Sequence, residues 1–275
     1  MIAETSLKKF PKVMGILNVT PDSFSDGGDY FSVGKAIRRG VEMLEEGADI
    51  IDIGGESTRP GSLPVSGEEE LGRVLPVITG IKKHFPAAVI SIDTTKHSVA
   101  DAAIDNGAEI INNVAGTDSN GSLAKLAAEK NCTYIIMHMQ GLPRIMQENP
   151  VYENVVDDIF YDLYKSIDSA KHYGVKNIVA DVGIGFGKTV EHNVELLKNI
   201  SRFKQLGVPI LLGISRKSFI GKILKINEAK DRDIGTLIIH ALLLTEDIDI
   251  IRVHNVNLLI MLKKLYEIFK KNKKI

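Results

Sequence analysis

The feature of this chain that most constrains its fold is a series of eight short apolar runs separated by amphipathic stretches. The runs are rich in β-branched residues and are apolar throughout, as in strands buried on both faces of a parallel sheet. The stretches between them carry apolar residues near helical spacing, which predicts a helix after most strands. We expect strands at Val13–Leu17, Ile50–Ile53, Val89–Ile92, Glu109–Asn112, Tyr134–Met137, Asn177–Ala180, Pro209–Leu212 and Ile250–Val253.

Glycines mark the ends of three of the expected helices. Gly47, Gly107 and Gly174 occupy the position where a left-handed C-terminal cap favours glycine. The helices expected are Lys35–Glu46, Glu69–His84, His97–Asn106, Leu123–Asn131, Val155–Tyr173, Val190–Phe203 and Ile234–Thr245.

Strict alternation of strands and helices indicates βαβ crossovers, and eight such units close into a (β/α)8 TIM barrel. A doubly wound open sheet is the alternative, but eight regular units within 275 residues favour closure. No Pro-, Gly- or Ser-rich linker divides the chain, so we expect one α/β domain over residues 1–275.

The charge balance and cysteine content exclude several classes of protein. Thirty-four basic and 35 acidic residues leave a net charge of −1, which argues against a nucleic-acid partner. A single cysteine, Cys132, cannot form an internal disulfide and points to a reducing, cytoplasmic compartment. No window approaches the roughly 20 apolar residues of a membrane helix, so we expect no membrane association.

Nearly every expected strand is followed by a charged or hydrogen-bonding residue. In a closed barrel the carboxyl ends of the strands carry the active site, whereas a purely structural barrel has no need of so many costly buried polar atoms. One such residue alone is more simply a helix cap or a satisfied core group, but the joint pattern predicts a site. The residues are Asn18, Asp52, Glu56, Ser57, Thr58, Arg59, Asp93, Asn112, Asn113, His138, Asp181, Ser215, Arg216, Lys217, Arg252 and His254.

Two of these groups suggest ligand chemistry. Arg252 and His254 are two apart on a strand, so both side chains leave the same face and could clamp an anion. A salt bridge from Arg252 to a neighbouring carboxylate is an equally weighted alternative. The segment from Asp181 to Lys188 carries three glycines at spacings that match neither a P-loop nor a Rossmann motif. We therefore expect a tight wall whose backbone approaches a ligand, with Phe186 stacking on a flat ring.

The loops after the first two strands, residues 18–28 and 54–61, are rich in turn residues and small hydroxyls. This composition is typical of plain turns or of mobile loops that close over a substrate, and their position favours closure. No His-x-His or His-Glu-x-x-His motif suggests a tightly held zinc. A loosely bound Mg²⁺, shared between the Asn18 amide oxygen and substrate phosphates, is compatible with the sequence.

With these residues in view, the chain resembles the dihydropteroate synthase family from about Val13 to Val256. Seven ordered motifs carry the resemblance. They are Met14–Gly28, Asp52–Gly61, Ile92–Thr94, Met137–Gly141, Asp181–Lys188, Ser215–Gly221 and Arg252–His254.

The resemblance implies that 6-hydroxymethyl-7,8-dihydropterin diphosphate condenses with 4-aminobenzoate, with Mg²⁺ assisting a dissociative release of diphosphate. It also implies a homodimer, a catalytic set of Asp93, Lys217, Arg252 and His254, and an Asp93 that is already ionised to stabilise the developing cation. By motif, the pterin pocket would comprise Asp93, Asn112, Met137, Asp181 and Lys217. The diphosphate and its metal would be held by Asn18, Thr58, Arg252 and His254. The 4-aminobenzoate site would comprise Phe24, Thr58, Arg59, Pro60, Phe186 and Ser218.

The chain departs from the family pattern at three positions, and other readings remain open. Family members commonly have proline where this chain has Val182 and aspartate where it has Asn113 and Asn255. A methyltetrahydrofolate-dependent methyltransferase would use a similar barrel and pterin pocket. An inert pterin-binding paralogue and an aldolase with Lys217 as a Schiff-base lysine are further alternatives.

Overall fold

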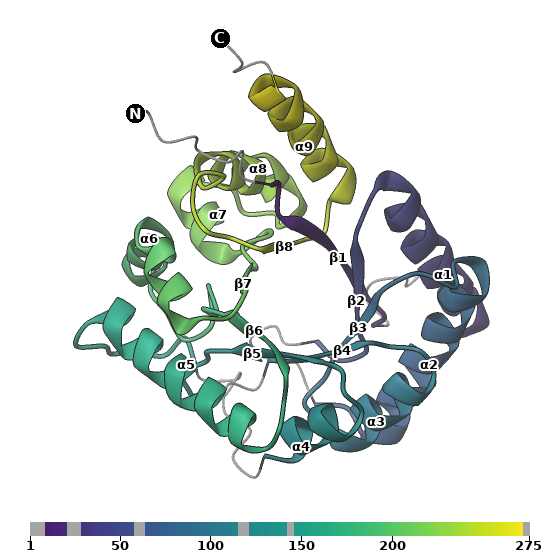
Figure 1. Ribbon diagram of the computed structural model, residues 1–275. Coiled ribbons are helices and arrows are strands. Elements are labelled where there is room, and N and C mark those ends of the chain that lie inside the picture. Colours follow the sequence, from purple (N-terminus) through teal and green to yellow (C-terminus); the bar gives the residue numbers. More distant parts are fainter. Residues whose placement is uncertain (1–8, 21–28, 58–63, 115–120, 142–145, 272–275) are drawn as a thin grey trace.

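The chain folds as a closed barrel of eight parallel strands surrounded by helices (Figure 1). The structure, a computed structural model, describes residues 9–20, 29–57, 64–114, 121–141 and 146–271. Strands follow one another around the barrel in chain order, and β8 pairs with β1 to close it. The predicted (β/α)8 TIM barrel is therefore confirmed, and the open doubly wound sheet is wrong.

Every predicted strand is present, with ends within one residue of those expected. The β-branched runs form the strands because their stiff side chains pack well on a pleated surface that is buried on both faces. The strands are β1 (Lys12–Asn18), β2 (Ile50–Gly54), β3 (Ile90–Asp93), β4 (Ile110–Asn113), β5 (Thr133–Met137), β6 (Asn177–Asp181), β7 (Ile210–Leu212) and β8 (Ile250–Val253).

The helices form an outer ring, and local capping sets several of their ends. Gly47, Gly107 and Gly174 have φ of +115°, +104° and +93°, as the expected glycine caps require. The helices are α1 (Asp29–Glu46), α2 (Gly67–His84), α3 (His97–Asp105), α4 (Ser122–Glu129), α5 (Val155–His172), α6 (Val190–Lys198), α7 (Ser218–Leu224), α8 (Asp233–Leu242) and α9 (Val256–Lys271), with 3₁₀ segments η2 (Ile200–Leu206) and η3 (Lys230–Arg232).

Three helix predictions are wrong in extent by three residues or more. Helix α1 begins at Asp29 and not at Lys35, and α8 ends at Leu242 and not at Thr245. The single helix expected over Val190–Phe203 ends at Lys198, and η2 follows it. Asn199 stands at the break, where its side-chain amide donates to the Glu195 carbonyl at 2.9 Å. An asparagine side chain competes for backbone groups in this way and so favours helix ends over helix interiors.

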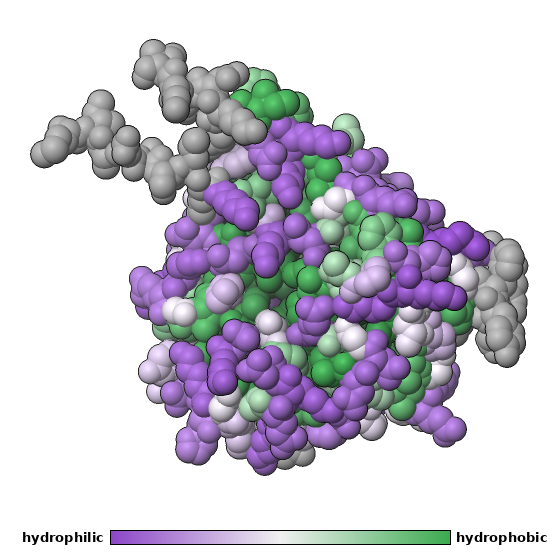
Figure 2. All heavy atoms as spheres, turned by 45° about the vertical axis from the view of Figure 1, so that its right-hand side comes forward, coloured by the Kyte–Doolittle hydropathy of each residue, from purple (hydrophilic) through white to green (hydrophobic). Residues whose placement is uncertain are grey.

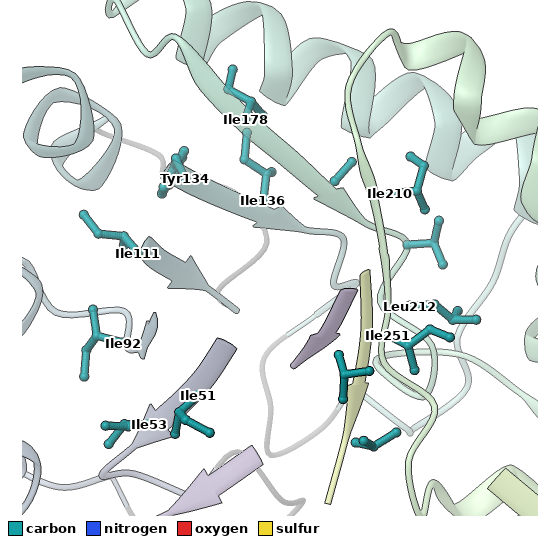
Figure 3. Close-up of a cluster of buried hydrophobic side chains, with 14 of the residues drawn as sticks. Ile51, Ile53, Ile92, Ile111, Tyr134, Ile136, Ile178, Ile210, Leu212 and Ile251 are labelled. Carbon is teal, nitrogen blue, oxygen red and sulfur yellow. The ribbon is translucent and has the colours of Figure 1, made fainter. Parts of the chain in front are cut away.

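Alternation along the strands divides the core into two parts. Ile51 and Ile53 belong to the larger cluster, which lies between strands and helices and is drawn in part in Figure 3. Successive side chains of a strand point to opposite faces, so Asp52 points into the barrel. The inner cluster comprises Met14, Ile50, Ile110, Ile135, Val179, Leu211 and Ile250.

This inner face runs from apolar to polar along several strands. On these strands an apolar side chain that points into the barrel is followed, two residues later, by a polar side chain that also points inward. This spacing arises because every second side chain of a strand lies on the same face. The pairs are Ile50 and Asp52, Ile110 and Asn112, Val179 and Asp181, and Ile250 and Arg252. The lower barrel is therefore a packed core, and its carboxyl end is a polar mouth.

The outer surface is largely hydrophilic on the face shown in Figure 2, with hydrophobic side chains visible between the polar ones. None of the helices in the described ranges is long and apolar enough to span a membrane. Exposed large apolar side chains gather on α7, α8 and α9, which lie side by side (Figure 1). They are Ile223, Leu224, Ile234, Ile238, Leu242, Met261, Leu265, Ile268 and Phe269.

Candidate active site

The strand register brings most of the predicted pterin-binding residues to one rim of the barrel. Asn18 pairs with Gly54, Gly54 pairs with Asp93, and Asp93 pairs with Asn112 across four adjacent strands. On the next two strands Met137 pairs with Asp181. Residues that are up to 163 positions apart in the sequence therefore meet at the carboxyl ends of the strands.

Arg252 forms the centre of a buried polar network at this rim. Its Nε donates to Asp52 Oδ2 at 2.6 Å and its Nη2 donates to Asp93 Oδ2 at 2.8 Å. Asn112 Nδ2 donates to the same Asp52 oxygen at 3.0 Å. The salt-bridge alternative for Arg252 is therefore what this structure shows. Since a guanidinium has five N–H donors, these two bonds still leave donors for an anion.

Asp52 also belongs to this network. The sequence placed it among the polar strand ends but gave it no substrate-binding or catalytic role. Its side chain is fully buried, and its Oδ1 has no hydrogen-bond partner in the described structure. The same alternation that points Asn112 and Arg252 inward places Asp52 among them. Its place at a strand end was visible in the sequence, but its contact with Arg252 follows from barrel closure.

Burial dominates the electrostatics of the two other carboxylates. It raises the pKa of Asp93 to about 7, with Asp52 adding to the rise and Arg252 opposing it. It also raises the pKa of Asp181, although the Gly183 N–H donates to Asp181 Oδ1 at 2.8 Å and favours the charged form. The ionised form of Asp93 is the one that forms an ion pair with Arg252 Nη2, and the expectation that Asp93 acts as an ionised group stays a prediction.

Lys217 faces these carboxylates from the loop after β7. Its Nζ lies 3.8 Å from the centroid of the Phe186 ring. Burial lowers the pKa of Lys217 to about 8, and the charge of Asp181 opposes that shift. Ser218 is the first residue of α7 and is exposed. Lys217, Phe186 and Ser218 thus lie together at one side of the mouth.

The residue before Lys217 adopts an unfavourable backbone conformation. Arg216 has φ of +60°, which non-glycine residues rarely adopt. Its side chain binds Asp233 through two hydrogen bonds, at 2.6 and 2.8 Å, and its N–H donates to Thr236 Oγ1 at 3.1 Å. These contacts offset a backbone strain of about 1–3 kcal/mol in the residue next to Lys217.

His254 follows β8 and contacts Ser215. Its N–H donates to Ser215 Oγ at 3.1 Å, and its Nδ1 lies 2.9 Å from the same oxygen. Burial, together with the charges of Arg216 and Arg252, lowers the pKa of His254 to about 3. At neutral pH His254 is therefore a neutral hydrogen-bonding group, and Arg252 supplies the cationic charge of the pair.

The three departures from the family pattern fit their surroundings. Asn255 Nδ2 donates to Asp233 Oδ2 at 3.1 Å, a bond that an ionised aspartate could not donate. Asn113 Nδ2 donates to the Tyr134 hydroxyl at 2.8 Å. Val182 is fully buried in the outer core. Asn255 and Asn113 thus each hold a neighbouring side chain, that of Asp233 and that of Tyr134.

The glycine segment after β6 closely approaches the backbone of the chain after β5. A Cβ at Gly183 would lie 1.8 Å from the backbone carbonyl oxygen of His138. A Cβ at Gly187 would lie 2.4 Å from the backbone carbonyl oxygen of Gln140. Both glycines have positive φ. Gly183 and Gly187 therefore let the segment pack directly on the chain after β5, and its close approach to a ligand stays a prediction.

Several predicted residues lie outside the described parts of the chain. They are Phe24, Thr58, Arg59 and Pro60, together with most of the two loops expected to be mobile. For the metal, Asn18 is half-buried at the end of β1. The described residues include no group of three or more His, Cys, Asp or Glu side chains arranged to hold a metal ion.

The closed barrel with carboxylates, an amide and two cations at its mouth has the character of a pterin-binding enzyme. Residues 14–254 match the family model described as pterin binding enzyme. The chain therefore belongs to this family of enzymes, and within it to the dihydropteroate synthases, which are transferases.

The dihydropteroate synthases that this chain resembles match it over most of their length. A dihydropteroate synthase of Clostridium beijerinckii is 47% identical over 247 residues, covering 89% of this chain and 88% of that protein. A dihydropteroate synthase of Xanthomonas albilineans with 4-aminobenzoic acid superposes with a TM-score of 0.88 at 38% identity, covering 96% and 94% of the two chains. A Yersinia pestis dihydropteroate synthase with a sulfonamide drug gives 0.88 at 38% identity and covers 95% of each chain.

Proposed function

We propose that this chain condenses 6-hydroxymethyl-7,8-dihydropterin diphosphate with 4-aminobenzoate to give 7,8-dihydropteroate and diphosphate, by a dissociative substitution. The observation that carries the proposal is the buried network in which Arg252 binds both Asp52 and Asp93 beside Asn112. It joins a cation suited to a diphosphate with carboxylate and amide groups suited to a pterin edge.

The pterin pocket is the polar mouth between β3 and β7. A pterin edge alternates hydrogen-bond donors and acceptors, so the Asp181 carboxylate and the Asn112 amide can hold it in one orientation. Lys217 adds a donor from the loop after β7, and Met137 supplies a buried apolar surface for the ring. The raised pKa of Asp181 is lowered again by a donating pterin N–H, because such a bond favours the carboxylate.

Release of diphosphate is the step in which Arg252 acts. Its remaining N–H donors bind the phosphate oxygens while Asp52 holds the guanidinium in place. His254 adds a neutral contact, and Thr58 is a further predicted contact. As diphosphate leaves, positive charge spreads from the exocyclic methylene into the pterin ring. An ionised Asp93 stabilises that charge without reorganisation.

Magnesium fits this site as an ion held chiefly by the substrate. Mg²⁺ prefers oxygen ligands, keeps several waters and often binds through few protein groups together with phosphates. The amide oxygen of Asn18, at the rim beside β2, is the protein ligand we propose. When bound, the ion neutralises charge on the departing diphosphate.

The 4-aminobenzoate site lies on the Lys217 side of the mouth. Phe186 offers its ring for stacking on the arylamine, and Ser218 stands at the start of α7 nearby. Phe24, Thr58, Arg59 and Pro60 complete the proposed site. The structure of the Xanthomonas albilineans relative with 4-aminobenzoic acid supports an arylamine as the second substrate.

The test is to mix purified protein, Mg²⁺ and both substrates and to measure dihydropteroate by mass spectrometry and diphosphate by a coupled assay. We expect equimolar formation of both products. Corrinoid-dependent methyl transfer without diphosphate release would instead identify a methyltransferase. Borohydride trapping of a carbonyl substrate on Lys217 would identify an aldolase, and pterin binding without turnover would identify an inert paralogue.

We further propose a cytoplasmic homodimer. The exposed apolar side chains of α7, α8 and α9 form an outer face, away from the barrel mouth, that a second copy would cover. The single cysteine, Cys132, is buried, as a reducing compartment allows. Sedimentation should show a dimer, and Leu265→Glu on α9 should convert it to a monomer. A wild-type monomer at micromolar concentration would contradict this arrangement.

A further inference from the structure

Lys188 ends the glycine segment after β6, and the proposed reaction gives it no role. Its side chain is only 3% exposed. The Nζ atom donates to the Phe186 carbonyl oxygen at 2.8 Å and lies 3.0 Å from His138 Nδ1. Burial of an amine costs free energy unless the amine is hydrogen-bonded, and these two partners tie Lys188 to the chain after β5 and to the glycine segment.

The imidazole of His138, the residue directly after β5, is suited to accept from this amine. Burial, with the charge of Lys188 adding to it, lowers the pKa of His138 to about 3, so the imidazole is neutral. Its Nδ1 can then accept from Lys188, while its Nε2 faces Asp162 Oδ2 at 3.6 Å. Burial lowers the pKa of Lys188 to about 7, and both its neutral and charged forms keep N–H donors for the Phe186 carbonyl.

In the glycine segment after β6, three consecutive backbone carbonyls each accept a hydrogen bond from a different side chain. Gln147 Nε2 donates to the Gly185 oxygen at 2.6 Å, and the Tyr152 hydroxyl donates to the Gly187 oxygen at 2.8 Å. The carbonyl between them belongs to Phe186, whose ring lies against Lys217. Lys188 is the side chain that binds this middle carbonyl from the buried side.

We propose that Lys188 is a positioning residue of the arylamine site: by holding the Phe186 carbonyl and His138 together, it fixes the Phe186 ring beside Lys217. Lys188 itself touches no substrate. The inference rests on the proposed function, because it assigns the Phe186 ring to 4-aminobenzoate. Its consequence is that loss of the amine loosens binding of the second substrate more than it slows the chemical step.

The experiment is steady-state kinetics of Lys188→Met at saturating pterin diphosphate. We expect the KM for 4-aminobenzoate to rise about tenfold or more with kcat within about threefold, the pattern of lost uniform binding. Lys176→Met is the matched control, since Lys176 is exposed just before β6 at the far end of the same strand. The control should leave both constants unchanged.

A double-mutant cycle separates positioning from a general structural role. In a Phe186→Ala background, Lys188→Met should change the KM by less than about twofold, because the ring on which it acts is gone. An equal rise in both backgrounds, or an unchanged KM in the single variant, would overturn the proposal. If the methionine variant does not fold, Lys188→Gln replaces it in the same two backgrounds. The glutamine side chain is polar but one bond shorter than that of lysine, so its nitrogen does not reach the Phe186 carbonyl. A wild-type protein that forms no dihydropteroate would refute the proposed function instead.

Discussion

Replacing Asp52 by asparagine tests the network on which the proposed chemistry depends. Asp52 is fully buried and binds both Arg252, at 2.6 Å, and Asn112, at 3.0 Å. Asparagine keeps the volume and one acceptor oxygen but removes the charge. Arg252 retains Asp93 as a partner at 2.8 Å, so we expect the variant to fold.

The size of the effect follows from the bond that is weakened. A hydrogen bond to a charged group contributes about 1.5–3 kcal/mol, and about 1.4 kcal/mol corresponds to a factor of ten. If the anchoring of Arg252 supports diphosphate release, kcat/KM for the pterin diphosphate should fall about 10- to 100-fold. Because the charge of Asp52 raises the pKa of Asp93, its removal should lower that pKa.

The assay is the pH profile of kcat/KM for the pterin diphosphate, measured for the wild type, Asp52→Asn and the exposed control Asp105→Asn. We expect a lower maximum and an acid limb displaced to lower pH in the Asp52 variant alone. A folded variant with wild-type kcat/KM would refute the anchoring of Arg252. An acid limb displaced to higher pH would refute the electrostatic coupling of Asp52 to Asp93.

Four further outcomes are expected. Arg252→Ala should weaken binding of the pterin diphosphate and spare the pterin alone, whereas Asp181→Ala should weaken both, as titration calorimetry would measure; equal losses for both ligands in both variants would contradict this division. The wild-type kcat/KM should rise with pH through about 7 as Asp93 ionises and fall above about 8 as Lys217 loses its proton, and a flat profile between pH 6 and 9 would count against these roles. A sulfonamide should compete with 4-aminobenzoate, and competition with the pterin diphosphate would refute the assignment of the arylamine pocket. Gly183→Ala should lower the free energy of unfolding by more than about 2 kcal/mol in urea titrations, because its Cβ would meet a backbone carbonyl at 1.8 Å; an unchanged midpoint would show that the segment can move aside.

Local sequence determined the elements of this protein and their order. Eight apolar, β-branched runs predict the eight strands to within a residue, because such runs are stable only when buried on both faces. The glycines after three helices predict the caps for an equally local reason, the positive φ that a left-handed residue needs. Helix ends are less well predicted. Helix α6 ends early, beside Asn199, because the asparagine side chain competes for backbone groups, and hydrophobic periodicity does not detect this competition.

The polar strand ends were also visible in the sequence, since parallel strands in a barrel present their carboxyl ends on one face. The sequence did not show which of these side chains bind one another. The contact between Asp52 and Arg252 joins residues 200 positions apart, and it exists because β8 closes against β1 beside β2.

Only the tertiary structure decided the charge states and the role of the glycine segment. The pKa of Asp93 depends on burial and on charges from β2 and β8. The bond from Lys188 to the Phe186 carbonyl depends on a turn that packs against the chain after β5. Hydrophobic periodicity is a property of neighbours along the chain. Desolvation and Coulomb interactions act between neighbours in space, so they are established only when the barrel closes.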